Sequence, residues 1–294
     1  MPAWTRGLLA LLLGLSFPGP DVTVQAEGAV LVGAGDIASC TSDASEATAR
    51  FLDRIEGTVF TLGDNVLEHG TEDEYASCYD PTWGRHRDRT RPVPGNHDYD
   101  TDGASGYFAY FAERAGTPGE GWYAYDLGGW HIVALNSNCD EIGGCGDGSA
   151  QLAWLEADLA ASTARCTLAY MHHPRFTSTP GGEDADLDAI WDALYAHGAE
   201  IVLSGHAHTY ERFAPMAPDG HPDPDGIVQF VAGTGGNDLH EFDRISPQSE
   251  ARNDETHGVL QLTLRSDGYD WEFVPVETGE FTDSGEAQCA PARN

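Results

Sequence analysis

Short apolar runs alternate with longer amphipathic stretches along most of this chain. The runs are rich in aliphatic and aromatic residues and end at turn-forming residues, a pattern typical of buried strands. They predict strands at Val30–Ala34, Thr58–Leu62, Trp122–Leu127, His131–Asn136, Thr167–Met171, Ile201–Leu203, Ile227–Ala232, Val259–Leu264 and Tyr269–Val274. Helices are predicted between a cap at Ser42 or Asp43 and a stop at Gly57, over Gln151–Ala160 after the cap Ser149, and over Leu187–His197 before Gly198.

The order of these elements indicates an α/β fold. The chain begins with a strand, a helix and a strand, whereas Ala124–Asn136 has the pattern of an antiparallel hairpin. We therefore expect mixed sheets covered by helices, with α+β character in the hairpin regions. The 294 residues show no repeat, linker or low-complexity block, so one catalytic domain over residues 27–294 is the simplest interpretation.

The N-terminus has the features of an export signal. Arg6 precedes the apolar run Gly7–Leu15, and Val24-Gln25-Ala26 offers small residues for cleavage. The run is too short to cross a bilayer, so a retained N-terminal anchor is the weaker alternative. We expect residues 1–26 to be a signal peptide and the mature protein to be secreted or periplasmic.

Six cysteines follow the signal segment, and an even number in an exported chain favours disulfides. Cys139 and Cys145 enclose a short glycine-rich loop and are the first candidate pair. Cys40 and Cys78 follow two acidic segments and are the second, which leaves Cys166 with Cys289. Many other pairings are compatible with the sequence, whereas a zinc-type cluster is disfavoured because no C-x-x-C motif occurs.

The net charge of −33 limits the range of partners. All 15 basic residues are arginines, and 48 residues are acidic. Such a chain repels a nucleic-acid backbone and an acidic membrane surface, so neither is expected as a partner. A small phosphate ester remains possible as a substrate, provided that metal ions and a few arginines supply a local positive charge. The oligomeric state stays open.

Residues that bind metals follow several of the predicted strands. Five segments share this placement: Gly35-Asp36, Gly63-Asp64-Asn65, Gly95-Asn96-His97-Asp98, Met171-His172-His173-Pro174 and Gly205-His206-Ala207-His208. Taken singly, each has an ordinary explanation as a turn, a helix cap or a hydrogen-bonded histidine. Together they indicate a two-metal hydrolase. The glycines are expected to let the chain turn sharply at the strand ends.

The chemistry of phosphate ester hydrolysis explains this set of residues. Two metal ions about 3.5–4 Å apart supply a nucleophile and neutralise the phosphoryl oxygens. Ions this close need a bridging anion, and a mixture of nitrogen and oxygen donors suits Fe, Zn or Mn, as divalent or trivalent ions. The donors occur in the order Asp36, Asp64, Asn96, His172, His206 and His208.

The five segments, in this order, resemble the calcineurin-like metallophosphoesterases. The extension His208-Thr209-Tyr210-Glu211-Arg212 is similar to the purple acid phosphatase branch of that superfamily. The resemblance runs from Gly33 to at least Gly236. It implies a four-layer sandwich of two mixed β-sheets flanked by helices, with the metal site at the C-terminal ends of the strands.

The resemblance also implies a role for each matching residue. Asp64 would bridge the two metals, with Asp36 and His208 binding the first metal. The second metal would be bound by Asn96, His172 and His206. Three further residues would be catalytic: His97 beside the leaving group, Asp98 orienting the ring of His97, and His173 reaching the phosphate.

Two positions depart from the family pattern. Most members have a histidine where this chain has Ala38, and the purple branch has a tyrosine ligand where it has Leu67. The first metal therefore lacks its usual fourth ligand, and no purple colour is expected. Glu68, His69, Tyr75 or water would have to substitute.

These observations favour a secreted phosphomonoesterase, resembling acid phosphatases, in which a metal-bound hydroxide attacks phosphorus. A phosphodiesterase or nucleotidase on the same scaffold is the alternative, and a non-catalytic binding protein is a third. A serine hydrolase is disfavoured because no G-x-S-x-G segment occurs.

The missing ligand gives a first prediction. The first metal should bind more weakly than the second, because fewer protein groups hold it. Metal counting during dialysis of the purified protein should therefore show two phases of loss. Two metals retained with equal affinity would contradict this prediction.

Overall fold

The computed structural model describes Met1 and residues 28–290 apart from 181, 183 and 277–280. Residues 2–26 of the expected signal peptide therefore lie outside the described part of the chain. Within that part, no helix has the length and apolar character needed to cross a membrane.

In the described part of the chain, thirteen strands form two sheets. The first has the order β13 (Ser284–Gln288), β12 (Gly268–Pro275), β11 (Gly258–Arg265), β1 (Ala29–Ala34), β2 (Thr58–Thr61) and β3 (Thr90–Arg91). The second has the order β10 (Ser249–Asn253), β8 (Tyr210–Phe213), β9 (Val228–Ala232), β7 (Ile201–Ser204), β6 (Cys166–Tyr170), β5 (Trp130–Ala134) and β4 (Tyr123–Leu127). Both sheets are mixed: β1, β2 and β3 are parallel in one, and β5, β6, β7 and β9 are parallel in the other.

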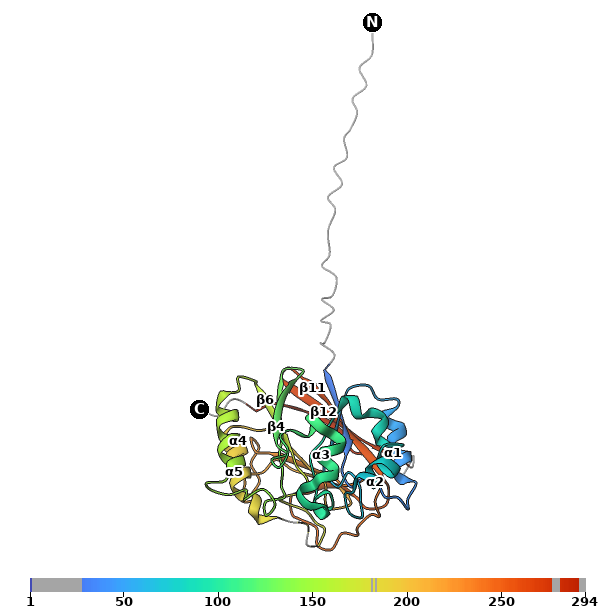
Figure 1. The fold of residues 1–294 in the computed structure, drawn as a ribbon. Coiled ribbons are helices and arrows are strands. Elements are labelled where there is room, and N and C mark those ends of the chain that lie inside the picture. The colour runs from blue at the N-terminus through green and yellow to red at the C-terminus, as the bar shows by residue number, and fades with distance from the viewer. Residues whose placement is uncertain (2–27, 181, 183, 277–280, 291–294) are drawn as a thin grey trace.

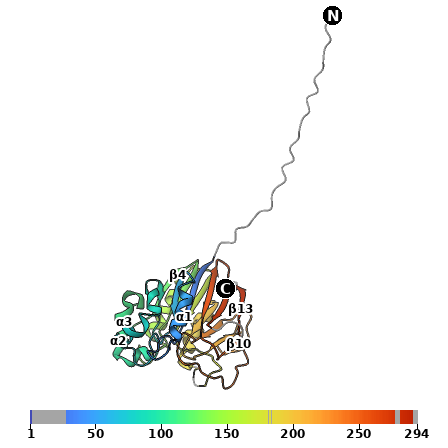
Figure 2. The ribbon, with the colours of Figure 1, turned by 90° about the vertical axis from the view of Figure 1, so that its right-hand side faces the viewer.

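Helices cover the outer faces of the sheets. They are α1 (Ala44–Leu52), α2 (Glu72–Glu74), α3 (Ser105–Phe111), α4 (Ala150–Ala161) and α5 (Asp188–Ala196), with a π-helical turn η1 (Tyr75–Tyr79) and the 3-10 turns η2 (Trp83–Arg89), η3 (His97–Asp100), η4 (Asp102–Ala104), η5 (Ala112–Ala115) and η6 (Ala185–Leu187). Figure 1 shows α4 and α5 on one side of the strands and α1 and α2 on the other. Figure 2 shows α1, α2 and α3 together on one side of the molecule, with β10 and β13 on the opposite side.

Alternation along the strands divides the core into three layers. Leu168 and Tyr170 of β6 point between the sheets, whereas Ala169 between them points to the layer under α4 and α5. In β1, Leu31 faces the inter-sheet layer and Val32 faces the layer under α1. This period of two produces the four-layer sandwich of helices, sheet, sheet and helices. The expected fold class is confirmed.

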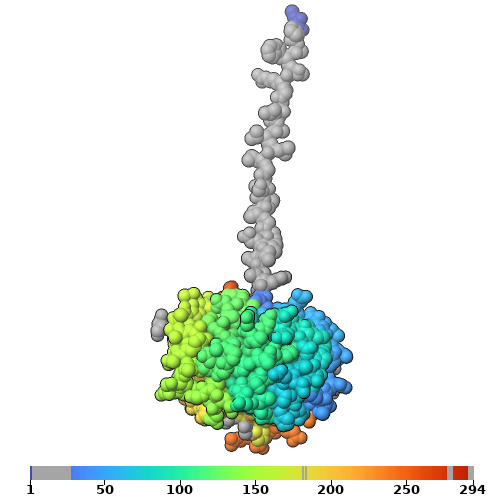
Figure 3. Space-filling view, viewed as in Figure 1, coloured from blue at the N-terminus to red at the C-terminus, as the bar shows by residue number. Residues whose placement is uncertain are grey.

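Local signals located most elements, and polar strands escaped them. Ser149 caps α4 by accepting the N–H of Leu152, as expected. The segment from Glu68 to Arg91, which the sequence left irregular, contains α2, η1 and η2. Strands β3, β8, β10 and β13 were not predicted, because they are short or polar and gain their hydrogen bonds only from neighbouring strands. The segment between β2 and β4, cyan to green in Figure 3, forms much of the face seen there.

Three disulfides tie loops to this framework. They join Cys40 to Cys78, Cys139 to Cys145 and Cys166 to Cys289. These are the three pairs that the sequence favoured. The first joins the loop after β1 to η1, and the third joins β6 to the C-terminal segment, so both restrain loops near the ends of parallel strands.

Candidate functional site

The six predicted metal ligands come together at one rim of the molecule. Asp36, Asp64 and Asn96 follow β1, β2 and β3, which are adjacent in the first sheet. His172 follows β6, and the segment from His206 to His208 follows β7, its neighbour in the second sheet. Because the carboxyl ends of parallel strands meet at the same edge of a sheet, the two sheets present their donors to each other.

The three residues predicted to bind the second metal, Asn96, His172 and His206, are called the second group here. Their donor atoms have the spacing of ligands around a single ion. The Oδ1 atom of Asn96 lies 2.9 Å from Nε2 of His172 and 3.1 Å from Nδ1 of His206. The two imidazole nitrogens are 3.3 Å apart. Ligands held at about 2.0–2.1 Å from one metal are separated by about 3.0–3.4 Å, depending on the coordination geometry. These three atoms therefore fit one metal ion between them.

The tautomer of His172 supports that fit. Its Nδ1 lies 2.7 Å from the carbonyl oxygen of Leu62, which only accepts, so Nδ1 carries the proton. Burial, followed by the nearby His206, holds the pKa of His172 well below its usual value, so the ring is neutral. Its Nε2 therefore presents a lone pair to the oxygen of Asn96, and a cation between them would make this contact favourable.

The residues predicted to bind the first metal, Asp36 and His208, form a first group that has the same arrangement with fewer donors. Nδ1 of His208 donates to the carbonyl oxygen of Asp238 at 2.7 Å, and Nε2 lies 3.1 Å from Oδ1 of Asp36. Asp36 is fully buried, and within the described chain its Oδ1 accepts no hydrogen bond. Burial lowers the pKa of His208, but Asp36 more than offsets this and raises it. Either a proton or a metal ion must therefore lie between this ring and the carboxylate.

Asp64 lies between the two groups. Donor atoms of Asp36, Asp64 and His172 all lie within 4.8 Å of one another, and Oδ2 of Asp64 is 3.5 Å from Nε2 of His172. Burial, followed by repulsion from Asp36, raises the pKa of Asp64 well above its usual value. Two buried carboxylates this close require positive charge, and a pair of metal ions sharing Asp64 would supply it.

Three ligands themselves adopt left-handed backbone conformations. The φ angles are 58° at Asp36, 46° at Asp64 and 63° at His206. Such angles cost non-glycine residues about 1–3 kcal/mol each and occur where surrounding contacts enforce them. Here the N–H of His206 donates to Oδ2 of Asp36 at 2.9 Å, and the N–H of Asp36 donates to the carbonyl of Gly63 at 3.1 Å.

The glycines before the ligands have a different role from the expected one. Among the four, only Gly63 has a positive φ, 79°. A Cβ atom at Gly95 would lie 2.1 Å from Oδ1 of Asp64, and one at Gly205 would lie 2.8 Å from Oδ2 of Asp36. These two glycines therefore make room for the carboxylates, whereas the turn itself is made by the ligand residues.

His97 lies at the exposed side of the donor groups. Its side chain is 39% exposed, and its Nε2 lies 4.0 Å from Oδ2 of Asp64. Its backbone N–H donates to the other oxygen of Asp64 at 2.9 Å, so the same residue helps to position the shared carboxylate.

The expected contact between Asp98 and the ring of His97 is not the one found. Asp98 is fully buried and accepts from the Tyr75 hydroxyl (2.6 Å), the Gly95 N–H (2.8 Å) and the Asn65 side chain (3.1 Å). Asp98 therefore links the loop that carries Asp64 to the loop that carries Asn96. The carboxylate beside the His97 ring is that of Asp100, 3.7 Å from Nδ1.

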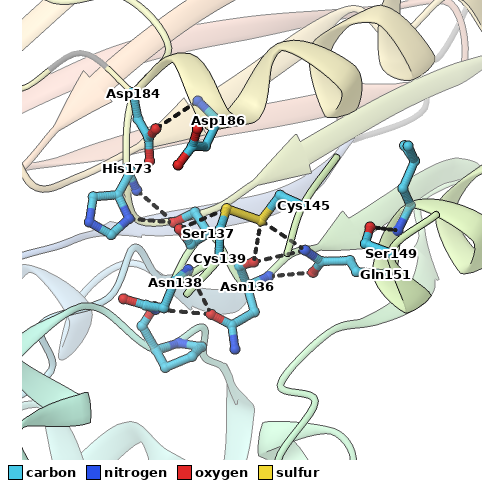
Figure 4. The surroundings of a disulfide bond; sticks show 12 residues. Asn136, Ser137, Asn138, Cys139, Cys145, Ser149, Gln151, His173, Asp184 and Asp186 are labelled. Atoms are coloured by element: carbon cyan, nitrogen blue, oxygen red, sulfur yellow. Dashed lines mark hydrogen bonds between the residues drawn. A yellow bond between two sulfur atoms is a disulfide. The ribbon is translucent and has the colours of Figure 1, made fainter. Parts of the chain in front are cut away.

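His173 packs against the second group. Its ring centroid is 4.5 Å from that of His206, and its donor atom belongs to a cluster with those of His172 and His206. Ser137 accepts the backbone N–H of His173 at 2.9 Å and also contacts its Nδ1 at 2.9 Å (Figure 4). This pair of contacts fixes the ring. Ser137 follows β5, and no motif in the sequence pointed to it.

A family model for calcineurin-like phosphoesterases matches residues 30–210, more than half of the chain. The chain belongs to the calcineurin-like phosphoesterase family. Purple acid phosphatase 21 of Arabidopsis thaliana is 30% identical over 279 residues, which cover 84% of this chain and 59% of that protein. Purple acid phosphatase 15 of the same plant is 31% identical over 241 residues, covering 69% and 44%.

The relatives also share the fold. Purple acid phosphatase PPD1 from yellow lupin (Lupinus luteus) seeds superposes with a TM-score of 0.69 at 20% identity, covering 90% of this chain and 54% of that one. The chain thus spans about half the length of the purple acid phosphatases it matches. Within the phosphoesterase family, these similarities support the purple acid phosphatase-like branch.

The two departures from the family pattern fall in apolar surroundings. Ala38 and Leu67 are buried, and the N–H of Leu67 donates to the carbonyl of Ala38 at 2.8 Å. Two of the proposed substitutes have other partners, because Tyr75 binds Asp98 and His69 lies 3.4 Å from Asp100. The side chain of His69 is 71% exposed.

One further imidazole lies beside Asp36 and His208. The ring of His240 stacks on that of His208, with centroids 3.9 Å apart and planes at 17°. Backbone contacts bring it there: the turn after β9 packs on the loop after β1, with Asn237 donating to the carbonyl of Asp36 at 3.0 Å. No sequence signal marks this histidine, because only tertiary contacts place it.

The close packing at Gly95 gives a second prediction. Gly95→Ala should lower the free energy of unfolding by about 1–3 kcal/mol through overpacking. It should also reduce metal content, since the new methyl group displaces the Asp64 carboxylate. Thermal unfolding of metal-free and metal-loaded protein, with elemental analysis, measures both effects. Gly146→Ala is the control, because its Cβ would meet no atom within 4 Å, and equal behaviour of the two variants would contradict the argument.

Proposed function

We propose that this protein is a metal-dependent phosphoesterase that hydrolyses phosphomonoesters. One observation carries the proposal. The donor atoms of Asp36 and His208 and those of Asn96 and His172 lie on either side of the carboxylate of Asp64. The family membership and the similarity to proteins named purple acid phosphatases support the same chemistry. Two bound metal ions would activate water and neutralise the phosphoryl oxygens.

In this proposal the ligands divide as their contacts suggest. Asp36 and His208 hold the first ion. The second is held by Asn96, His172 and His206, whose positions are fixed by the sheet edge. The carbonyls of Leu62 and Asp238 hold the protons of His172 and His208 away from the ions, which keeps the inner nitrogens available.

His97 is proposed as the proton donor to the leaving oxygen. It lies on the exposed side of Asp64, where a departing alcohol enters solvent. The carboxylate of Asp100 lies beside its Nδ1, at 3.7 Å. A general acid in such a position typically accelerates a reaction by about 10²–10⁴-fold.

His173 is proposed to bind a phosphoryl oxygen. Burial holds the pKa of His173 well below its usual value, so its ring is neutral at physiological pH. With Nδ1 engaged by Ser137, Nε2 is the nitrogen left for the substrate. A fixed neutral donor orients the phosphate and leaves the charge balance to the metal ions.

Export to the periplasm or the medium belongs to the same proposal. All six cysteines are paired in disulfides, which persist in oxidising compartments. The signal-like N-terminal sequence agrees with this location. Mass spectrometry of the protein secreted by its host tests it, and a mature chain beginning near Glu27 is the expected result.

Loss of the shared carboxylate gives a third prediction. Protein loaded with Zn, Mn or Fe should hydrolyse a simple aryl phosphomonoester faster than the corresponding diester or a nucleotide. Asp64→Asn should lower kcat/KM by more than about a hundredfold, because changes even outside the ligand shell of a metal cost about 10–100-fold. Asp126→Asn, an exposed substitution on β4, is the control. Unchanged turnover in Asp64→Asn would refute the assignment, and faster diester hydrolysis would favour the phosphodiesterase alternative.

The position of His97 gives a fourth prediction. His97→Ala should leave metal content intact and reduce kcat for alkyl phosphates by about 10²–10⁴-fold, with a smaller loss for aryl phosphates whose leaving groups need no proton. His69→Ala, at an exposed imidazole nearby, serves as the control. Loss of metal would make His97 a ligand, and equal losses for both substrates would remove its role as an acid.

A further inference from the structure

A cavity of about 280 Å³ adjoins the second donor group. Asn96 and His173 form part of its wall, so it begins where the phosphate is proposed to bind. The loop closed by Cys139 and Cys145 forms another part, and Figure 4 shows this loop together with His173 and the segment containing Asp184 and Asp186. A leaving group attached to the phosphate would extend into this space.

The volume of the cavity limits what it can accept. It corresponds to about nine water molecules at about 30 Å³ each. A short alkyl chain with one terminal group therefore fits this space.

The wall of this cavity is strongly acidic. Five carboxylates line it: Asp100, Asp140, Glu141, Asp184 and Asp186. None of its described lining residues is an arginine, and the chain contains no lysine. The nearest arginine in sequence, Arg175, pairs with Asp188 instead, at 2.5 Å. Within the described residues, none of the five carboxylates forms an ion pair with an arginine, although Asp100 lies beside the imidazoles of His69 and His97.

This imbalance distinguishes the cavity from other acidic parts of the surface. Near α1, for example, Arg85 pairs with both Glu46 and Asp53. At the cavity, the proposed metal ions neutralise the phosphate side only, and a neutral or anionic leaving group would face uncompensated negative charge. Tyr99 adds an aromatic ring to the same wall, held in place by a 2.8 Å hydrogen bond from Asn136. Carboxylates combined with an aromatic ring are the surroundings that recognise ammonium groups.

We propose that this cavity selects phosphomonoesters whose leaving group carries a positive charge, such as the phosphate of an amino alcohol or of a quaternary ammonium alcohol. The inference rests on the proposed function, because it concerns the leaving-group side of the same site. The metal ions would hold the dianionic phosphoryl group, and the carboxylates of the wall other than Asp100, which lies beside the ring of His97, would face the cation at the other end of the substrate. Such a zwitterionic substrate is negative at its phosphate and positive at its leaving group, whereas the metal-loaded site is positive where the phosphate binds and negative along the cavity wall.

The test compares two substrates of equal shape. Choline phosphate and its uncharged isostere, dimethylbutyl phosphate, are assayed with the metal-loaded full-length protein at low ionic strength. The kcat/KM ratio should favour the cationic substrate by about tenfold or more, because several carboxylates act on one charge. The preference should reside mainly in KM, since the cation is bound equally in the ground state and the transition state. In about 1 M salt it should decrease strongly.

A charge-neutralising variant separates binding in the cavity from intrinsic reactivity. The double variant Glu141→Gln/Asp186→Asn changes two exposed wall residues, and it should bring the substrate ratio several-fold closer to unity. Glu156→Gln, an exposed substitution on α4, is the matched control and should leave the ratio unchanged. The reactivity of each ester is the same for all variants, so only the cavity can alter the ratio.

The outcomes distinguish this inference from the function on which it rests. Hydrolysis of an aryl phosphate with an unchanged substrate ratio in the double variant, or a preference for the uncharged ester, would overturn the inference and leave the phosphoesterase assignment intact. Failure to hydrolyse any phosphomonoester after metal loading would overturn both.

Discussion

The burial of two carboxylates at the junction of two sheets is the constraint on which the site depends. Asp36 and Asp64 are withdrawn from solvent almost completely, and burial, followed by repulsion from Asp36, raises the pKa of Asp64. A fold keeps such a pair only where positive charge offsets it. The surrounding residues are arranged for that purpose, because the imidazole of His172 faces Asp64 and that of His208 faces Asp36.

The residues around the donors hold them in place although three backbone conformations in the site are strained. Three ligand residues have left-handed backbones, and glycines at neighbouring positions leave only enough room for the carboxylates. Below them, Asp98 links the loops after β2 and β3 through Tyr75, Asn65 and Gly95. Contacts within the chain thus position the donors, which lowers the cost of assembling the centre.

Charge gives the molecule a second level of organisation. A chain with a net charge of −33 is poorly suited to bind a phosphate unless cations are concentrated at one place. The donor groups provide that place, while the adjoining cavity keeps the acidic character of the rest of the surface. The two together define a site that is positive at one end when metals are bound and negative at the other.

The sequence by itself determined the donor inventory and the fold class, and it favoured the three cysteine pairs over other pairings that it left open. Apolar runs located the parallel strands because a buried strand needs a nearly continuous apolar segment, and Gly-Asp, Gly-Asn and Gly-His dipeptides marked their ends. Asp36, Asp64, Asn96, His172, His206 and His208 could be listed from this pattern and from the resemblance to a family. Polar edge strands such as β13 could not, since their hydrogen bonds come from a neighbour and leave no apolar pattern.

Tertiary structure alone decided how those residues act. The hydrogen bond from the N–H of His206 to Asp36 joins residues 170 positions apart. Other contacts between residues far apart in the sequence also shape the site. Carbonyl oxygens set the histidine tautomers, Tyr75 binds Asp98 so that it does not contact the ring of His97, and His240 stacks on His208. Local sequence records the preference of a segment for a strand or a turn. It does not record which distant segment will pack against it. The protonation, backbone strain and charge of this site all arise from those contacts between distant segments.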